Sequence, residues 1–180
     1  MGPRQRAPFE IKLLEMESYI QKAIDSHLEG SHLILVENKI AWKLMLDIVI
    51  VGDVNLCDID YLSYAVRAAL TSCVVPEVKI NYNSLSNEYN VEVLDETVTL
   101  FKPEQVPHLF CFGVAGRVFL FDMNFEEYKS CDTSFLGVTN SKSEILQFEK
   151  IDGHGIGINL LTGAMDIARR NARSLYQELK

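Results

Sequence analysis

The chain has 180 residues, of which 48% are hydrophobic and 23% charged, with 10 glycines and 5 prolines. This length allows one domain or two small lobes with a real core, and the composition excludes a disordered or fibrous protein. The formal net charge of −8 argues against a strong general binder of nucleic acid, because such proteins draw much of their affinity from neutralised phosphates.

The cysteines form no recognisable metal-binding motif. The sequence has no Cys-x-x-Cys pair and no histidine at ligand spacing from its cysteines, which are Cys57, Cys73, Cys111 and Cys131. We interpret them as buried, reduced thiols. No leader pattern is visible, and no apolar run approaches the ~20 residues of a membrane span, so we expect an intracellular protein. We also expect the protein to bind no cofactor.

The first residues with a regular pattern predict a helix. Residues 1–8 hold two arginines and two prolines without periodicity, so we assign them to a flexible tail or an expression remnant. From residue 9 to 28, apolar residues recur at three- and four-residue spacing, which is typical of an amphipathic helix. Gly30 is a plausible stop for that helix.

Two strands are expected next. Residues 32–36 and 41–51 are apolar runs joined by a short polar turn around Asn38, which favours an antiparallel pair. In the second run every even-numbered residue is apolar, and the odd-numbered ones become apolar toward its end. We therefore expect that end to be covered on both faces.

An acidic turn and a second helix follow. Residues 52–58 form the turn, and the helix reaches about Ser72 with small alanines that would allow close packing on a sheet. We expect Asp58 to cap this helix, while Asp53 and Asp60 face water near its positive end. A cation site in this turn is the less favoured interpretation.

The remaining sequence predicts short strands and a closing helix. After a strand at residues 74–80, the asparagine-rich stretch 81–90 is the best linker, dividing lobes at 9–80 and 91–180. Ala115-Gly116 predicts a tight hairpin turn, and residues 160–179 return to helical spacing. The expected strands of the second lobe are 91–93, 97–100, 108–114, 117–121, 135–139 and 145–149. This order predicts a two-lobed α+β fold.

Several motifs recur in a characteristic order. In the first lobe they are Leu46-Asp47-Ile48, Asp53-x-Asn55-Leu56-x-Asp58, Ala65-Val66-x-Ala68-Ala69-Leu70 and Val75-Pro76-x-Val78. In the second lobe they are Val106-Pro107, Phe121-Asp122 before Glu126-Glu127, and Gly153-x-Gly155. Over residues 9–180 this pattern resembles the RNase PH family, most closely the catalytically inactive ring subunits of the eukaryotic RNA exosome.

The resemblance implies a ribosomal-protein-like α/β first lobe and a mixed-sheet second lobe. Family members carry further N-terminal strands and a Gly-Arg-rich segment before the point that matches residue 9. The first lobe is therefore expected to be partial. Either the sequence is a fragment of a longer protein, or the protein has lost half of the sheet of this lobe, which would leave an exposed sheet edge.

For catalytic relatives, the resemblance implies a phosphate-dependent exoribonuclease reaction that releases nucleoside diphosphates. Such a site needs clustered cations, yet the sequence has no arginine between Arg6 and Arg67. Cys57 stands where relatives carry a phosphate-binding arginine, while Glu127 and Thr133 fall where they carry a pair of aspartates. We therefore predict degenerate positions and no catalytic residues.

Basic residues in the second lobe are weak candidates for RNA binding. Arg169, Arg170 and Arg173 form the densest group, and Arg117 stands in a hairpin; structural surface roles are favoured for all four. The glycine-rich stretch 153–157 is interpreted as a plain strand-to-helix turn rather than a phosphate cradle.

The resemblance predicts a non-catalytic subunit of the exosome ring in the nucleus and cytoplasm, supporting RNA processing and degradation from the three-prime end. Its expected partners are other RNase PH-type subunits in a hetero-oligomeric ring and single-stranded RNA, with no membrane, and a homodimer when isolated. An active phosphorolytic exoribonuclease and a ribosomal-protein-like binding module remain the alternatives.

Overall fold

The computed structural model describes the backbone of residues 8–178 and the side chains of residues 12–174. Within that range the three longer helices lie close to the predicted ones. α3 was not predicted, because it is too short to show helical spacing of apolar residues in the sequence. The helices are α1 (Pro8–His27), α2 (Ile59–Ser72), α3 (Phe125–Lys129) and α4 (Ile158–Glu178), with 3-10 turns η1 (Ser31–Leu33) and η2 (Leu56–Asp58). None of the described helices is long and apolar enough to span a membrane. The tail predicted over residues 1–8 lies outside the described residues, except that Pro8 begins α1.

The described strands form three antiparallel sheets. β1 (Ile34–Val36) pairs with β2 (Ile40–Ala41), and β3 (Val74–Asn83) pairs with β4 (Glu88–Thr99). The largest sheet has the order β6-β5-β7-β8 and contains β5 (His108–Ala115), β6 (Val118–Phe121), β7 (Thr133–Thr139) and β8 (Ile145–Gly153). Gly116 adopts a φ of +61° in the predicted hairpin turn between β5 and β6. The predicted α+β fold is confirmed.

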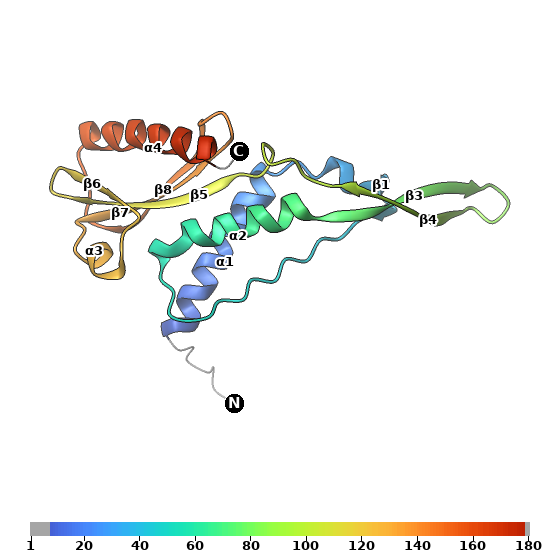
Figure 1. The fold of residues 1–180 in the computed structure, drawn as a ribbon, viewed down its shortest axis with the longest axis horizontal. Helices are drawn as coiled ribbons and strands as arrows, with labels where there is room; N and C mark the ends of the chain where they lie inside the picture. Colours follow the sequence, from blue (N-terminus) through green and yellow to red (C-terminus); the bar gives the residue numbers. More distant parts are fainter. Residues whose placement is uncertain (1–7, 179–180) are drawn as a thin grey trace.

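Helices cover both faces of the four-stranded sheet. Its central strands β5 and β7 are buried along almost their whole length, as expected for apolar runs covered on both sides. Ala168 of α4 shares a core with Phe112 on one face. On the other face Met16 of α1 and Val66 of α2 share a second core with Leu109. Figure 1 shows α4 across the sheet from α1 and α2.

Residues 42–55 form an extended segment that runs alone between β2 and η2 (Figure 1). The Trp42 amide donates to the Leu33 carbonyl at 2.8 Å, and beyond it residues 43–54 make no backbone hydrogen bond to any other described residue. The prediction of a strand over 41–51 is therefore wrong beyond Ala41, because a strand needs a neighbour to pair with. The segment is exposed and unpaired but belongs to none of the described sheets, so the exposed sheet edge expected for the first lobe stays a prediction.

The side-chain alternation predicted for this segment is nevertheless present. Leu44 and Ile50 are half-buried, and Leu46 and Ile48 are 38% exposed. On the odd-numbered face Val49 is 85% exposed, although we expected both faces to be covered here. The segment therefore has one face against the helices, while its other face places Met45, Val49 and Val51 in solvent together with Lys43 and Asp47.

β3 and β4 form a long ribbon that projects from the rest of the molecule (Figure 1). The expected linker at residues 81–90 is the tip of this ribbon, where Asn81 pairs with Asn90 and Asn87 adopts a φ of +55°. Its asparagines suit a hairpin turn as well as they suit a linker, and the sequence alone does not separate the two. The division into lobes at 9–80 and 91–180 stays a prediction.

Candidate functional site

The turn before α2 meets the second half of the chain in a corner that we call the η2 corner. It is formed by η2, the first turn of α2, the middle of β5 and α3. Asp60 accepts a hydrogen bond from the Cys111 amide at 2.6 Å, and the Tyr61 hydroxyl donates to Asp122 at 2.8 Å. These contacts bring the turn that holds Cys57 close to the residues just before α3, the helix that holds Glu127, whereas Thr133 lies in β7.

Cys57 lies in η2, in the turn where the resemblance expects a phosphate-binding arginine. Its side chain is 5% exposed and belongs to the buried part of the corner. Burial, and next the charge of Asp58, raise the pKa of the Cys57 thiol to about 11. The group is therefore an uncharged thiol near neutral pH and offers no positive charge to a phosphate.

The acidic residues of the turn differ from their predicted roles. The Asp58 carboxylate accepts from the Asn55 amide at 2.8 Å in a capping box of η2, and it makes no side-chain cap of α2. Asp60 is half-buried rather than facing water, because it accepts from Cys111 across 51 residues of sequence. Asp53 is exposed, as predicted.

Burial changes the protonation of Asp60. Its pKa is raised to about 7, first by burial and then, against the lowering effect of the Cys111 hydrogen bond, by the charge of Asp122. The corner therefore holds a carboxyl group that is partly protonated near neutral pH. An acid of this kind attracts no phosphate.

Glu127 and Thr133 are both engaged in structural hydrogen bonds. Glu127 closes a capping box at the start of α3, where it accepts from the Asn124 amide at 2.9 Å and donates its own amide to the Asn124 side chain. Thr133 is 1% exposed and donates its hydroxyl to the Asp152 carbonyl at 2.8 Å. The spacing Asn124-x-x-Glu127 is itself a capping-box signal that the sequence carries.

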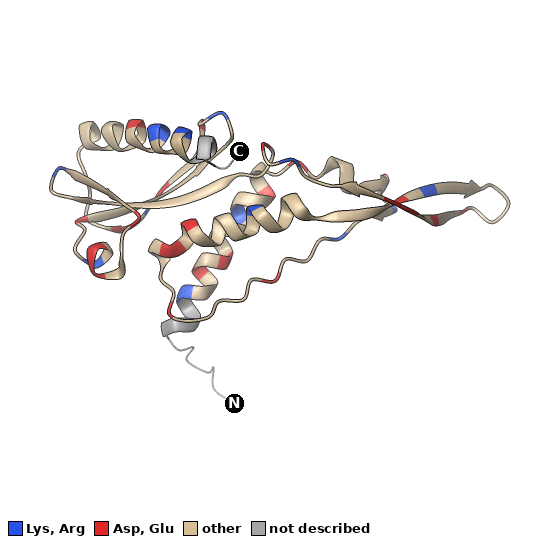
Figure 2. Cartoon of the chain, in the orientation of Figure 1, with Lys and Arg blue, Asp and Glu red and all other residues tan. Residues whose placement is uncertain are grey.

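Lysines close to the corner already have partners. Lys12 donates to the Asn55 side chain at 2.8 Å, and its ammonium lies 5.0 Å from the Phe125 ring centroid. Lys129 lies 3.9 Å from the same centroid and 3.7 Å from Glu126. Figure 2 shows acidic residues at the start of α2 and on α3. The described side chains thus make the corner acidic, which disfavours an anionic substrate.

The arginine candidates lie away from the η2 corner. Arg169, Arg170 and Arg173 are exposed on α4, across the sheet from α1 and α2, and Arg169 lies 3.7 Å from Asp166. Arg117 is exposed in the hairpin turn between β5 and β6. The structure does not bring any of them to Cys57.

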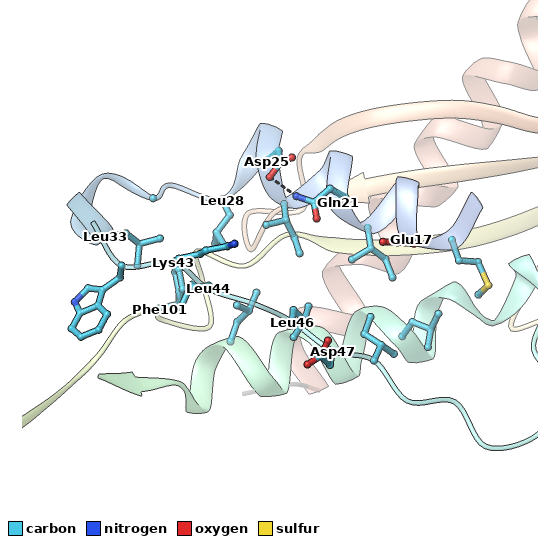
Figure 3. A pocket seen from close by; sticks show the side chains of 18 of the residues that line it. Glu17, Gln21, Asp25, Leu28, Leu33, Lys43, Leu44, Leu46, Asp47 and Phe101 are labelled. Atoms are coloured by element: carbon cyan, nitrogen blue, oxygen red, sulfur yellow. Dashed lines mark hydrogen bonds between the residues drawn. The ribbon is translucent and has the colours of Figure 1, made fainter. Parts of the chain in front are cut away.

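A cavity of about 860 Å³ lies between α1, the extended segment and α2. Figure 3 shows Leu44 and Leu46 between the two helices, with Gln21 donating to Asp25 on α1. Most of its lining side chains are apolar, and none is a predicted site residue. The sequence signals its walls through the apolar faces of α1 and the segment, but it does not show that the space between them stays open.

No protein-family model matches the chain, and a search of curated proteins found no match. A chain of the Archaeoglobus fulgidus exosome with RNA bound to the active site matches with 19% identity and a TM-score of 0.66, covering 98% of this chain and 65% of that chain. A chain of an archaeal exosome core matches with 18% identity and a TM-score of 0.63, covering 97% of this chain. The chain spans 65% of the length of both. Its fold is therefore the RNase PH-like fold of exosome-core chains.

Proposed function

We propose that the chain is a non-catalytic subunit of an exosome ring, supporting three-prime-end RNA processing and degradation. The fold likeness to exosome-core chains supports the ring assignment. The observation that carries the non-catalytic role is Cys57, which is buried, uncharged and flanked by carboxylates in the turn where phosphate would bind.

The remaining site geometry supports the same proposal. Phosphorolysis gathers negative charge on phosphate and RNA, so its transition state needs cations and oriented donors. In the described η2 corner the carboxylates of Asp58, Asp60 and Asp122 surround the turn, and Lys12 is engaged with Asn55. Such a corner does not stabilise the reaction on its own.

The proposed partners are other RNase PH-type subunits in a hetero-oligomeric ring, with single-stranded RNA guided through the assembled ring in the nucleus and cytoplasm. The Archaeoglobus fulgidus exosome holds RNA at its active site, which motivates the RNA part of this proposal. The weak candidates Arg117, Arg169, Arg170 and Arg173 are exposed and lie in elements outside the η2 corner, so a guiding surface would be separate from the degenerate site.

The test is phosphate-dependent release of nucleoside diphosphates from a short single-stranded RNA by the purified chain. We expect no product above a phosphate-free control. Robust release that is abolished by E127Q would overturn the proposal in favour of an active exoribonuclease. Glutamine can still serve the capping box at Asn124, so this variant should remain folded.

A second measurement separates the ring assignment from the ribosomal alternative. Affinity purification of the tagged chain from cells, followed by mass spectrometry, is expected to recover other RNase PH-type subunits. Recovery of ribosomal particles without such subunits would overturn the ring assignment.

A further inference from the structure

Residues 42–51, the first part of the extended segment, have the properties of an edge strand that lacks a partner. Beyond Trp42 its backbone makes no hydrogen bond to a described residue, and it carries a row of exposed apolar side chains. These are Met45, Val49 and Val51, which are 79%, 85% and 96% exposed. An exposed apolar strand with free amides and carbonyls is a template for pairing with another chain.

One edge of the segment is open along its length. The Trp42 amide points toward η1, the turn just before β1, since it donates to the Leu33 carbonyl there. Amides alternate between the two edges of a strand, so those of the odd-numbered residues point to the opposite edge. Figure 1 shows no strand beside the segment on either edge. The open edge therefore presents the backbone groups of Lys43, Met45 and Asp47.

We propose that this open edge pairs with the same segment of a second copy of the chain, antiparallel and centred on Met45. In this register Lys43 of each copy lies directly opposite Asp47 of the other. The Lys43–Asp47 ion pair is therefore made twice by symmetry, and Leu44 lies opposite Leu46. The charge pattern of the segment is thus complementary to itself. This inference goes beyond the proposed exosome role and does not rest on it.

The charges also favour the register centred on Met45 over the next possible register, which is centred on Asp47. A register centred on Asp47 would place the two Asp47 carboxylates directly opposite each other, which is unfavourable. In the Met45-centred register the backbone groups of residues 43, 45 and 47 form about six hydrogen bonds between the copies. Met45 then lies against its own counterpart, which covers part of the exposed apolar face.

The first test is the mass of the purified 180-residue chain by sedimentation velocity over a range of concentrations. We expect a dimer whose dissociation constant rises at least about 10-fold in M45P, because proline removes an amide from the centre of the ladder. K43D and D47K should each weaken the dimer by about 3- to 30-fold, and the double variant K43D/D47K should restore it. A chain that stays monomeric at about 100 μM would overturn the proposal.

The second test reports the register through cysteine cross-linking. Opposed hydrogen-bonded residues have Cα atoms about 5.5 Å apart, within the reach of a disulfide, so M45C is expected to cross-link under mild oxidation. V49C is the matched control, because Val49 is similarly exposed but lies about 27 Å from its counterpart in this register. Cross-linking of V49C as fast as M45C would overturn the register, whatever the outcome for the exosome role.

Discussion

The carboxylate of Asp60 accepts a hydrogen bond of 2.6 Å from the backbone amide of Cys111. One turn later in α2, the hydroxyl of Ser63 accepts from the Leu109 amide at 2.8 Å. Both amides belong to β5, the central strand that joins β6 to β7. Polar side chains of α2 therefore fix the helix at a defined position on the sheet, in addition to the apolar contacts that surround them.

The Asp60 carboxyl should make stability depend on pH. The folded chain holds its proton with a pKa of about 7, above the ordinary value. Proton binding to Asp60 therefore stabilises the folded state. This contribution to the free energy of unfolding is fully present below the ordinary pKa of about 4 and is lost as the pH rises to about 7. Between pH 5 and pH 8 we expect the wild-type free energy of unfolding to fall about 1 to 3 kcal/mol more than that of D60N.

Urea unfolding at several pH values measures this difference. Asparagine keeps an acceptor for the Cys111 amide, so D60N should remain folded. The exposed Asp53 of the same turn supplies the control, and D53N should follow the wild-type profile. A D60N profile that matches wild type would contradict the assignment of this pH dependence to Asp60.

Loss of the Ser63 hydroxyl should destabilise the fold. It accepts from the Leu109 amide and lies 3.1 Å from Nδ1 of the buried His108. S63A would leave the Leu109 amide buried without this acceptor, at a cost of about 1 to 3 kcal/mol in thermal or urea unfolding. S72A on the same helix is the comparison, since Ser72 is exposed and should change stability by less than about 0.5 kcal/mol. Equal losses in the two variants would rule out this role of Ser63.

Gly153 should not tolerate a side chain. Its φ is +86°, and a Cβ at this position would overlap the backbone carbonyl of Asp132 and the Cα of Thr133. We expect G153A to lose about 2 kcal/mol or more, from backbone strain and from this overlap. A Cβ at Gly155 meets nothing within 4 Å, so G155A should unfold close to wild type in the same denaturant titration. A stable G153A would show that the end of β8 has room for a side chain next to Asp132 and Thr133.

The thiols should react with iodoacetamide in a fixed order. The pKa of the Cys57 thiol is raised to about 11 from the ordinary value of about 9. At pH 8 its thiolate fraction is therefore about 100-fold smaller than that of an ordinary cysteine. Burial also raises the pKa of the Cys111 thiol, and both side chains are inside the fold. Mass spectrometry should find the half-buried Cys73 alkylated first and Cys57 and Cys111 last. In urea the four should react alike, and prompt labelling of folded Cys57 would argue against a buried, neutral thiol.

The sequence predicted those parts of the fold that depend on local periodicity. The apolar spacing from residue 9 to 28 anticipated α1 at Pro8–His27, and Ala115-Gly116 anticipated the β5–β6 turn. It failed at residues 42–51, where alternation is correct but no described neighbour completes a strand. At residues 81–90 the composition predicted a linker where the structure has the tip of the β3–β4 ribbon, because pairing partners rather than composition decide whether such residues form a hairpin turn.

The candidate site was predictable in its residue types but not in its contacts. Cys57 could be placed in the turn from the sequence, and its lack of charge follows from chemistry. The role of Asp60 could not be predicted, since Cys111 lies 51 residues away and nothing local marks the pair. The cavity beside α1 depends on three segments that come together only in the folded chain.

α1 also contacts a strand that is made much later than α1 itself. Lys22 of α1 lies 3.0 Å from Glu149 of β8, a partner 127 residues later in the chain. At about 5 to 20 residues per second, a ribosome reaches Glu149 roughly 6 to 25 s after Lys22. During that interval the apolar face of α1 has no finished sheet to cover it. The newly made chain therefore passes through a period in which a chaperone or a neighbouring nascent chain can bind α1 before its own sheet does.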